Sequence, residues 1–222
     1  MKTLLLKSLA AASLLAASAA AHAALVVFNT QASFLASVVS PGADSFTGLS
    51  IIDSTPSPLL RSAGSYAYTA TSSSGASASS FFGAGSVANP WLSTNGATDT
   101  ITFSGFSPGV NAIGGLFFGS DVNGAFTSGT VVLTARDSFG ATSTQTIANA
   151  ALSSFIGFQS TGTITSLAVS SVSPNSTVWP TVDNLTLAVG AVAAVPEPQT
   201  WALMLGGLGA IGALARRRRR GA

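Results

Sequence analysis

Hydrophobic and polar positions alternate most clearly in the middle of the chain. Between positions 131 and 136, Val131, Leu133 and Ala135 face one way, while Val132, Thr134 and Arg136 face the other. Strict alternation is typical of a strand with one buried and one solvated face. The segment Thr142–Ile147 follows the turn at 137–140 and is expected to pair back on this strand.

Further strands are expected wherever short apolar or alternating runs end at turn residues. At 112–118 the run is almost continuously apolar, which indicates burial on both faces, and Asn123-Gly124 is suited to a tight hairpin. A shift of the apolar phase between Ile164 and Leu167 predicts a β-bulge. The expected strands are 25–28, 44–52, 66–69, 101–104, 112–118, 131–136, 142–147, 152–158, 161–172 and 184–189.

The remaining segments are expected to be connections. A short helix at 31–39 would precede a Pro41-Gly42 turn, and the small polar stretch 72–80 is expected to be a loop. Trp91 and Trp179 each adjoin a proline, which places both tryptophans in loops. About nine or ten short strands at this spacing predict an all-β fold, a two-sheet sandwich of the jelly-roll kind.

The two ends of the chain depart from the strand pattern. An apolar run at 201–215 contains no charge and ends in Arg216, Arg217, Arg218, Arg219 and Arg220. As a helix it would extend roughly 23 Å, short of a bilayer core of roughly 30 Å unless Trp201 and the arginine stems lengthen its reach. The arginines would stay on the cytoplasmic side and leave the preceding chain outside. The alternatives are a buried core helix, or arginines that bind nucleic acid or anionic lipid.

The N-terminal segment reads as a secretory signal peptide. Lys2 and Lys7 precede an apolar stretch at 9–21, and Ala21-His22-Ala23 is a small-x-small site for signal peptidase. An uncleaved N-terminal anchor is the alternative. The expected domains are a signal peptide at 1–23, an exported β-sandwich domain at 24–194 and a C-terminal sorting signal at 195–222.

Composition then limits the chemistry of the exported domain. Between the two end segments stand two arginines and six aspartates, a formal net charge of about −4, so the basic pI of 9.5 reflects the ends and no nucleic-acid partner is expected. The chain has no cysteine, and its one histidine, His22, lies in the signal peptide. Disulfides, thiolate or imidazole metal sites and Ser-His-Asp triads are therefore excluded from the mature domain.

The C-terminal end resembles a known sorting signal. Pro196-Glu197-Pro198, the glycine-rich apolar run and the arginine cluster are similar in content and order to the PEP-CTERM signal of Gram-negative bacteria that produce exopolysaccharide. The resemblance implies a membrane-embedded exosortase as partner, with processing near Pro196, Glu197 and Pro198. Short pieces at 46–49, 155–158 and 182–187 also resemble PEP-CTERM cargo domains with lectin-like sandwiches.

Candidate chemistry within the domain is sparse. No spacing among the six aspartates identifies a catalytic pair, so no catalytic residue, cofactor or metal is expected. Asp121 and Asp183 each begin a short calcium-like stretch, but a hairpin turn and a strand-leading cap are the preferred interpretations. Trp91 and Trp179 are candidate glycan contacts, because aromatic faces can stack on sugar rings.

These features predict a non-enzymatic protein of the cell envelope or extracellular matrix, associated with exopolysaccharide or biofilm. Signal peptidase and an exosortase would process it, and its C-terminal helix would cross the membrane at least transiently. The alternatives are a hydrolase that acts on extracellular polysaccharide through an aspartate pair, and a surface adhesin that keeps its membrane anchor.

Overall fold

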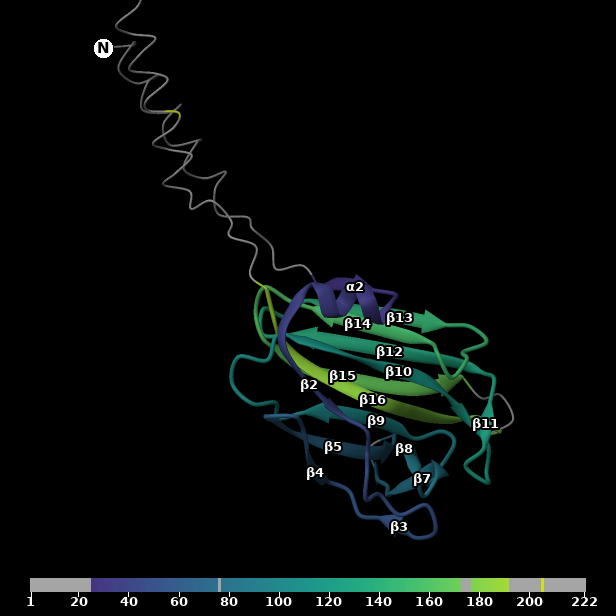
Figure 1. Ribbon diagram of the computed structural model, residues 1–222. Coiled ribbons are helices and arrows are strands. Elements are labelled where there is room, and N and C mark those ends of the chain that lie inside the picture. Colours follow the sequence, from purple (N-terminus) through teal and green to yellow (C-terminus); the bar gives the residue numbers. More distant parts are fainter. Residues whose placement is uncertain (1–24, 76, 173–176, 192–204, 206–222) are drawn as a thin grey trace, which may run out of the picture. The chain divides into compact units, whose positions relative to one another are not determined.

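Two antiparallel β-sheets pack face to face in the part of the chain that the structure describes (Figure 1). The structure is a computed structural model, and it describes residues 25–75, 77–172, 177–191 and 205. These residues apart from 205 belong to one compact unit, Ala23–Ala191. The predicted all-β sandwich is confirmed, while its jelly-roll and lectin-like character stays a prediction. The predicted signal peptide and the helix at 201–215, Leu205 excepted, lie outside the described residues.

Sheet A, as far as it is described, has nine strands. They are β1 (Val26–Phe28), β2 (Val38–Asp44), β3 (Ser54–Thr55), β7 (Phe81–Ser86), β8 (Asn89–Thr94), β10 (Ala112–Ser120), β11 (Phe126–Thr127), β14 (Phe155–Gln159) and β16 (Trp179–Gly190). Their order is β1-β14-β10-β16-β8-β7-β3, with β11 beside β10 and β2 beside β16. The long strand β16 therefore joins the two halves of this sheet.

Sheet B has seven strands within the same described ranges. They are β4 (Leu59–Ala63), β5 (Tyr66–Ser74), β6 (Ser77–Ala78), β9 (Thr100–Ser104), β12 (Thr130–Asp137), β13 (Thr142–Ile147) and β15 (Ile164–Val172). Their order is β13-β12-β15-β9-β5-β4, with β6 beside β5. Strand β13 thus forms one edge of sheet B, and β4 forms the other.

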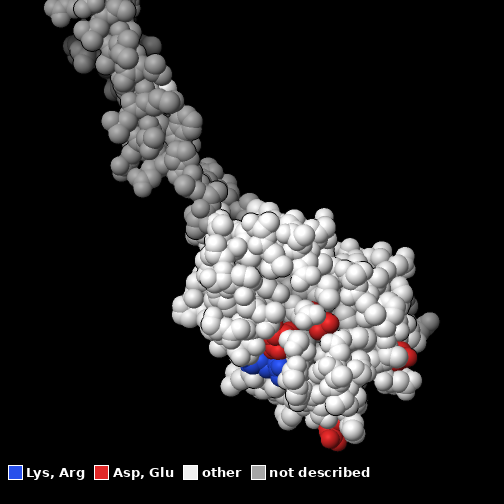
Figure 2. Space-filling view, viewed as in Figure 1, with Lys and Arg blue, Asp and Glu red and all other residues white. Residues whose placement is uncertain are grey.

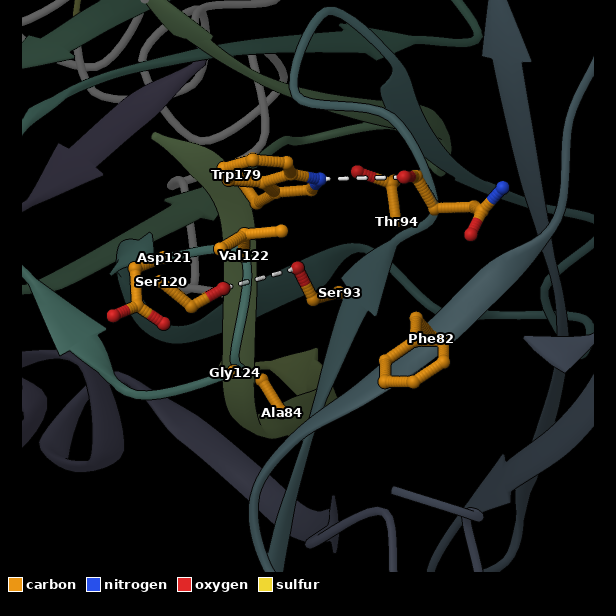
Figure 3. Close-up of a pocket in the computed structure, with 10 residues that line it drawn as sticks. Phe82, Ala84, Ser93, Thr94, Ser120, Asp121, Val122, Gly124 and Trp179 are labelled. Atoms are coloured by element: carbon orange, nitrogen blue, oxygen red, sulfur yellow. Dashed lines mark hydrogen bonds between the residues drawn. The ribbon is translucent and has the colours of Figure 1, made fainter. Parts of the chain in front are cut away.

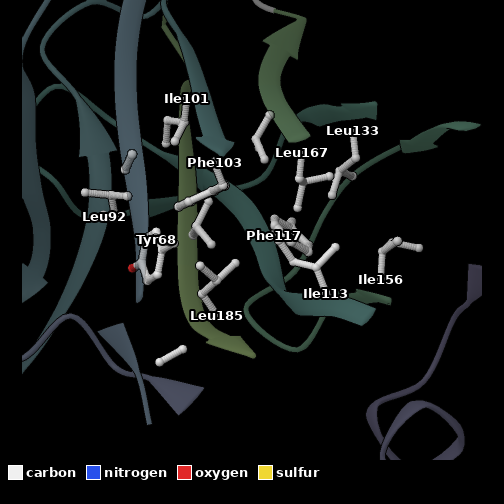
Figure 4. Close-up of a cluster of buried hydrophobic side chains, with 14 of the residues drawn as sticks. Tyr68, Leu92, Ile101, Phe103, Ile113, Phe117, Leu133, Ile156, Leu167 and Leu185 are labelled. Carbon is white, nitrogen blue, oxygen red and sulfur yellow. The ribbon is translucent and has the colours of Figure 1, made fainter. Parts of the chain in front are cut away.

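The main core lies between the sheets and is built from the inward positions of both (Figure 4). Phe103, Leu133 and Leu167 of sheet B and Phe117 and Leu185 of sheet A have no exposed surface. The alternation predicted for 131–136 is confirmed, since Val131, Leu133 and Ala135 are buried and their neighbours are not. The core therefore follows directly from the period-two pattern.

A second, smaller cluster covers part of the outer face of sheet A. The helix α2 (Gln31–Ala36) begins at Thr30, whose hydroxyl oxygen accepts a hydrogen bond from the Ser33 amide, and it buries Phe34 completely. The Phe34 ring packs against Phe28 and Phe155, with ring centroids 5.8 and 5.5 Å apart. A six-residue helix is unstable alone, so this docking is what holds it.

Several predicted elements agree closely with the structure. Strand β13 pairs back on β12 from Arg136–Thr142 to Val131–Ile147, as expected. The turn around Asn123 and Gly124 joins β10 to β11. The bulge predicted in the 161–172 strand is confirmed, because the pairing of β15 with β12 skips Thr165.

The segment 38–52 differs from its prediction. The helix ends at Ala36, and β2 runs through Pro41-Gly42 to Asp44, where a turn had been expected. Proline is tolerated because the pairing of β2 with β16 is irregular there and Ser40 has a φ of +49°. The predicted strand at 44–52 is wrong, since Phe46 and Gly48 have positive φ and Leu49 donates a backbone hydrogen bond to Phe46.

Three other expectations about loops are also wrong. The segment 72–80 is mostly strand, because β5 continues to Ser74 and pairs with β6. Both tryptophan–proline pairs lie in strands: Pro90 is the second residue of β8, and Pro180 is the second residue of β16. A missing amide hydrogen costs least at the start of a strand, which explains why these prolines are tolerated.

Candidate functional site

A small cavity on the outer face of sheet A is the best-formed candidate site (Figure 3). Its volume is about 130 Å³. The lining comes from β7, β8, β10, β16 and the loop between β10 and β11; it includes Phe82, Ala84, Ser93, Thr94, Asn95, Ser120, Asp121, Val122, Gly124 and Trp179. Segments far apart in the sequence therefore supply its walls.

The buried hydroxyl groups of Ser93 and Ser120 form the floor of this cavity, and the buried hydroxyl of Thr181, which is outside the lining, contacts both of them. Ser93, Ser120 and Thr181 are at most 3% exposed, and they lie on neighbouring strands. The Thr181 hydroxyl donates to Ser120 Oγ at 2.8 Å, and the Ser93 hydroxyl donates to the Pro180 carbonyl at 3.1 Å. The Ser93 and Ser120 oxygens are 3.3 Å apart. Because a hydroxyl has one donor and two acceptor positions, this group retains unused acceptors.

Trp179 forms one wall of the cavity. Its indole nitrogen donates to the Asn95 carbonyl at 3.3 Å, which fixes the orientation of the ring. Val122, 72% exposed, projects from the β10–β11 loop beside it (Figure 3). The Gly124 carbonyl accepts a hydrogen bond from the Gly85 amide, and this bond holds the loop against β7.

The cavity contains no charged group directed into it. Asp121 belongs to the lining, but its carboxylate points away from Ser93 and Phe82 (Figure 3). Asp121 Oδ1 accepts the amide hydrogens of Asn123 and Ala125 at 2.8 and 2.9 Å. The aspartate thus closes the hairpin turn, as the sequence indicated, and no group of three or more metal-ligand side chains occurs within the described ranges.

The two tryptophans predicted as glycan contacts lie in different surroundings. Only Trp179 lines the cavity. Trp91 packs edge-on against Phe118, with ring centroids 5.0 Å apart, and Phe118 in turn contacts Phe126. Trp91 therefore supports the small aromatic cluster beneath the β10–β11 loop.

Three buried aspartates outside the cavity, Asp44, Asp99 and Asp137, hold the fold together. Asp44 accepts two hydrogen bonds from Arg61 at 2.7 and 2.8 Å and one from the Tyr68 hydroxyl at 2.6 Å. Asp99 accepts from the Gly96 amide and the Ser79 hydroxyl. Asp137 closes the β12–β13 turn through two amides and also accepts from Ser160.

Asp44, Arg61 and Tyr68 form a hydrogen-bonded triad, and the pKa values of Asp44 and Tyr68 follow from the contacts within it. Burial by itself would raise the pKa of Asp44, but hydrogen bonds from Arg61, Tyr68 and the Phe46 amide outweigh it and lower the pKa. Burial, and then the negative charge of Asp44, raise the pKa of the Tyr68 hydroxyl. The triad is therefore a charged, hydrogen-bonded brace between β2, β4 and β5.

The position of Asp183 differs from the one that the sequence suggested. It lies in the middle of β16, opposite Leu116, and not at the entry to the strand. Its carboxylate accepts hydrogen bonds only from the neighbouring Asn184, at 2.7 and 3.2 Å, among the contacts of the described chain. Burial raises the pKa of Asp183, because no cation among the described residues compensates the lost hydration.

The sequence did not single out the cavity floor or the adjoining Thr181. Ser93, Ser120 and Thr181 are ordinary strand residues in a serine- and threonine-rich chain, so no spacing distinguishes them. The proximity of Thr181 to Trp179 was the one local signal. The predicted cleavage residues Ala21 and Ala23, the motif Pro196, Glu197 and Pro198, and the five arginines lie outside the described residues.

Comparison with known proteins identifies the C-terminal segment. Residues 194–220 match the family model of the PEP-CTERM protein-sorting motif, which confirms the resemblance seen in the sequence. The motif implies exosortase-dependent sorting to the cell envelope or surface. No curated protein and no solved structure matches the chain. Within the described residues, no helix has the length and apolar character needed to span a bilayer.

Proposed function

We propose that this chain is a non-enzymatic protein of the envelope or extracellular polysaccharide matrix, and that its sandwich binds a neutral glycan in the cavity beside Trp179. The PEP-CTERM motif supports the delivery of the protein to the envelope. The composition of the cavity supports the choice of ligand. An indole wall beside the two buried hydroxyl groups of Ser93 and Ser120 is the single observation on which the proposal rests.

The chemistry of the cavity favours an uncharged, hydroxylated ligand. A sugar presents apolar C–H faces that can stack on Trp179, and its hydroxyl groups can donate to the unused acceptors of Ser93 and Ser120. A charged ligand would lose its hydration without meeting an opposite charge. A neutral sugar therefore fits this site better than an anion or a cation.

The size of the cavity limits how much of the glycan can enter. Sites for drug-sized ligands have volumes of about 300–1,000 Å³, well above the 130 Å³ found here. The cavity accepts one small group, such as a terminal residue or a ring substituent, while the rest of the chain lies outside. Binding of this kind is weak for a single site and suits a matrix in which many copies act together.

The aspartates support the non-enzymatic part of the proposal. Asp44, Asp99, Asp121 and Asp137 are engaged in ion pairs or turn hydrogen bonds, and Asp183 is buried beside Asn184. Glycoside hydrolysis by the common mechanisms needs two carboxyl groups that face one substrate. None of these five carboxyl groups lines the cavity with its oxygens directed inward.

Replacing the indole tests the site. We expect Trp179→Ala to weaken binding about fivefold, because loss of an aromatic stacking contact costs about 1 kcal/mol. Trp179→Phe should retain most of the affinity, since it keeps an aromatic face. The measurement is calorimetric titration of the purified protein with oligosaccharides from the producing cell's own exopolysaccharide.

Phe139→Ala is the matched control, because Phe139 is 66% exposed and does not line the cavity. Equal loss of affinity in the Phe139 and Trp179 variants would show that binding is not at the cavity. Release of new reducing ends from the polysaccharide by the unmodified protein would instead favour the hydrolase alternative. Unchanged melting temperatures are required for all three variants.

A further inference from the structure

The edges of the two sheets differ in how well they are protected. Edge strands carry unpaired backbone N–H and C=O groups, and proteins usually shorten, cover or charge them. In sheet A, β1 has three residues and β3 has two. In sheet B, the edge strand β4 follows Pro56 and Pro58, carries Arg61 and has the backbone of β2 beside its end, where Gly42 approaches Ala63.

Strand β13 lacks all of these protections. It has six residues, Thr142–Ile147, with no charge, no proline and no glycine. It pairs with β12 without a register shift, and none of the described residues pairs with its other edge. Alternate residues of an edge strand direct their backbone groups outward, so about three amide–carbonyl sets are available for a further strand.

We propose that β13 pairs antiparallel with β13 of a second copy of this chain, so that the two copies of sheet B form one continuous sheet. Under a two-fold axis perpendicular to the sheet, residue i of one copy meets residue j of the other and j meets i, and the residue on the axis meets its own copy. Any charge in β13 would then face its own copy or a neighbouring like charge, and this strand has none. The strand is therefore complementary to itself.

The side-chain pattern also restricts the register. Opposed residues in an antiparallel pair lie on the same face of the sheet, so the exposed Thr142, Thr144 and Thr146 must meet threonines of the second copy. Residues on the same face can meet only if the two-fold axis passes through a residue of β13. An axis through Thr144 or through Gln145 brings the largest number of residues into pairs. A threonine pair of this kind already occurs within the chain, where the Thr134 and Thr144 hydroxyl oxygens are 3.1 Å apart across β12 and β13.

The cysteine-free chain allows a direct test in the full-length protein. Thr144→Cys and Gln145→Cys each introduce one thiol, and the residue on the axis should form a disulfide dimer under mild oxidation of intact cells. Thr102→Cys is the matched control, since Thr102 lies on β9 in the interior of the same sheet. We expect a band of doubled mass on a non-reducing gel for one of the two β13 variants and none for the control.

A charge exchange provides the second test. Thr144→Lys with Thr146→Lys should give a monomer in sedimentation velocity runs, and so should the corresponding pair of glutamates. Mixing the two variants should restore the dimer, which a folding defect could not do. Absence of cross-linking in both β13 variants, equal cross-linking at Thr102, or failure of the mixture to associate would each overturn the proposal.

Discussion

Asp44 and Asp183 are both buried carboxylates, but their surroundings have opposite effects on stability. Asp44 is paired with Arg61, whose guanidinium also lies 5.5 Å from the centre of the Phe46 ring. Asp183 has only Asn184 as a hydrogen-bond donor among the contacts of the described chain. The folded state therefore favours the charged form of Asp44 and the neutral form of Asp183.

We expect Asp44→Asn to lower the free energy of unfolding by about 3 kcal/mol, because it leaves the partly buried guanidinium of Arg61 without its partner. The contribution of a lowered pKa is present above the ordinary value of 3.8 and is lost as the pH falls through the lowered pKa. The unmodified protein should thus lose stability in acid more steeply than the variant. Thermal unfolding followed by circular dichroism between pH 7 and pH 2 checks this difference, and parallel curves would contradict it.

Asp183→Asn should act in the opposite direction. The variant removes a buried charge but keeps an oxygen that can accept from the Asn184 amide. Because the pKa of Asp183 is raised, its unfavourable effect is absent below the ordinary value of 3.8 and develops as the pH rises through the raised pKa. We expect a gain on the order of 1 kcal/mol at pH 7, or roughly 2–4 °C in Tm, which disappears towards pH 3.

The exposed Asp53 supplies the control for this measurement. Asp53→Asn makes the same chemical change at the surface, and it should leave Tm within error at both pH values. A gain at pH 7 that persists in acid would mean that the Asp183→Asn substitution stabilises the strand by another route than the loss of charge.

At the scale of elements, α2 and the β10–β11 loop each cover part of the outer face of sheet A. The helix contributes Phe34, and Gly157 on β14 makes room for the ring, since a methyl group added there would overlap it. Docking of α2 therefore depends on the large side chain of Phe34 and on the absence of a side chain at Gly157. The sequence predicted the helix but not this contact, because Phe34 and Gly157 are far apart in the chain.

Phe34→Ala should cost about 3–5 kcal/mol, as expected for a fully buried phenylalanine that leaves a cavity. Leu35→Ala, one residue further along the same helix, should cost much less because Leu35 is 39% exposed. Urea unfolding of the two variants gives the comparison. Equal losses would show that helix propensity, and not docking, determines the stability of α2.

At the scale of the whole molecule, charged side chains are few, and the face seen in Figure 2 shows only a few patches of them. Between the two end segments the chain has two arginines, six aspartates and no lysine. Such a surface has weak long-range electrostatic fields. Association with a neutral polysaccharide should consequently depend little on ionic strength.

The intact mass of the protein from producing cells and their medium tests its processing. We expect a species that begins at Ala24 and ends near Pro196, because signal peptidase and the exosortase would remove the two ends. Glu197→Ala should retain the C-terminal segment if the motif is read by that enzyme. Recovery of the unmodified chain with Arg216–Arg220 still attached would instead support a permanent membrane anchor.

The sequence by itself determined the C-terminal sorting signal and the two-sheet architecture of this protein. The sorting motif and the arginine cluster are each a short run of consecutive residues, and the period-two pattern of strands such as β12 depends only on which neighbours are apolar. Local chemistry of this kind can be read without a fold. The same is true of the bulge at Thr165, which shifts the apolar phase within a single strand.

Only the tertiary structure decided where the polar residues meet. Ser93, Ser120 and Thr181 lie on three strands that are separated in sequence but adjacent in sheet A, and the ion pair of Asp44 with Arg61 joins the two sheets. Strand order also leaves β13 as a free edge among the described strands. These arrangements depend on which strands become neighbours, and that choice is made by packing across the whole core and not by any local pattern.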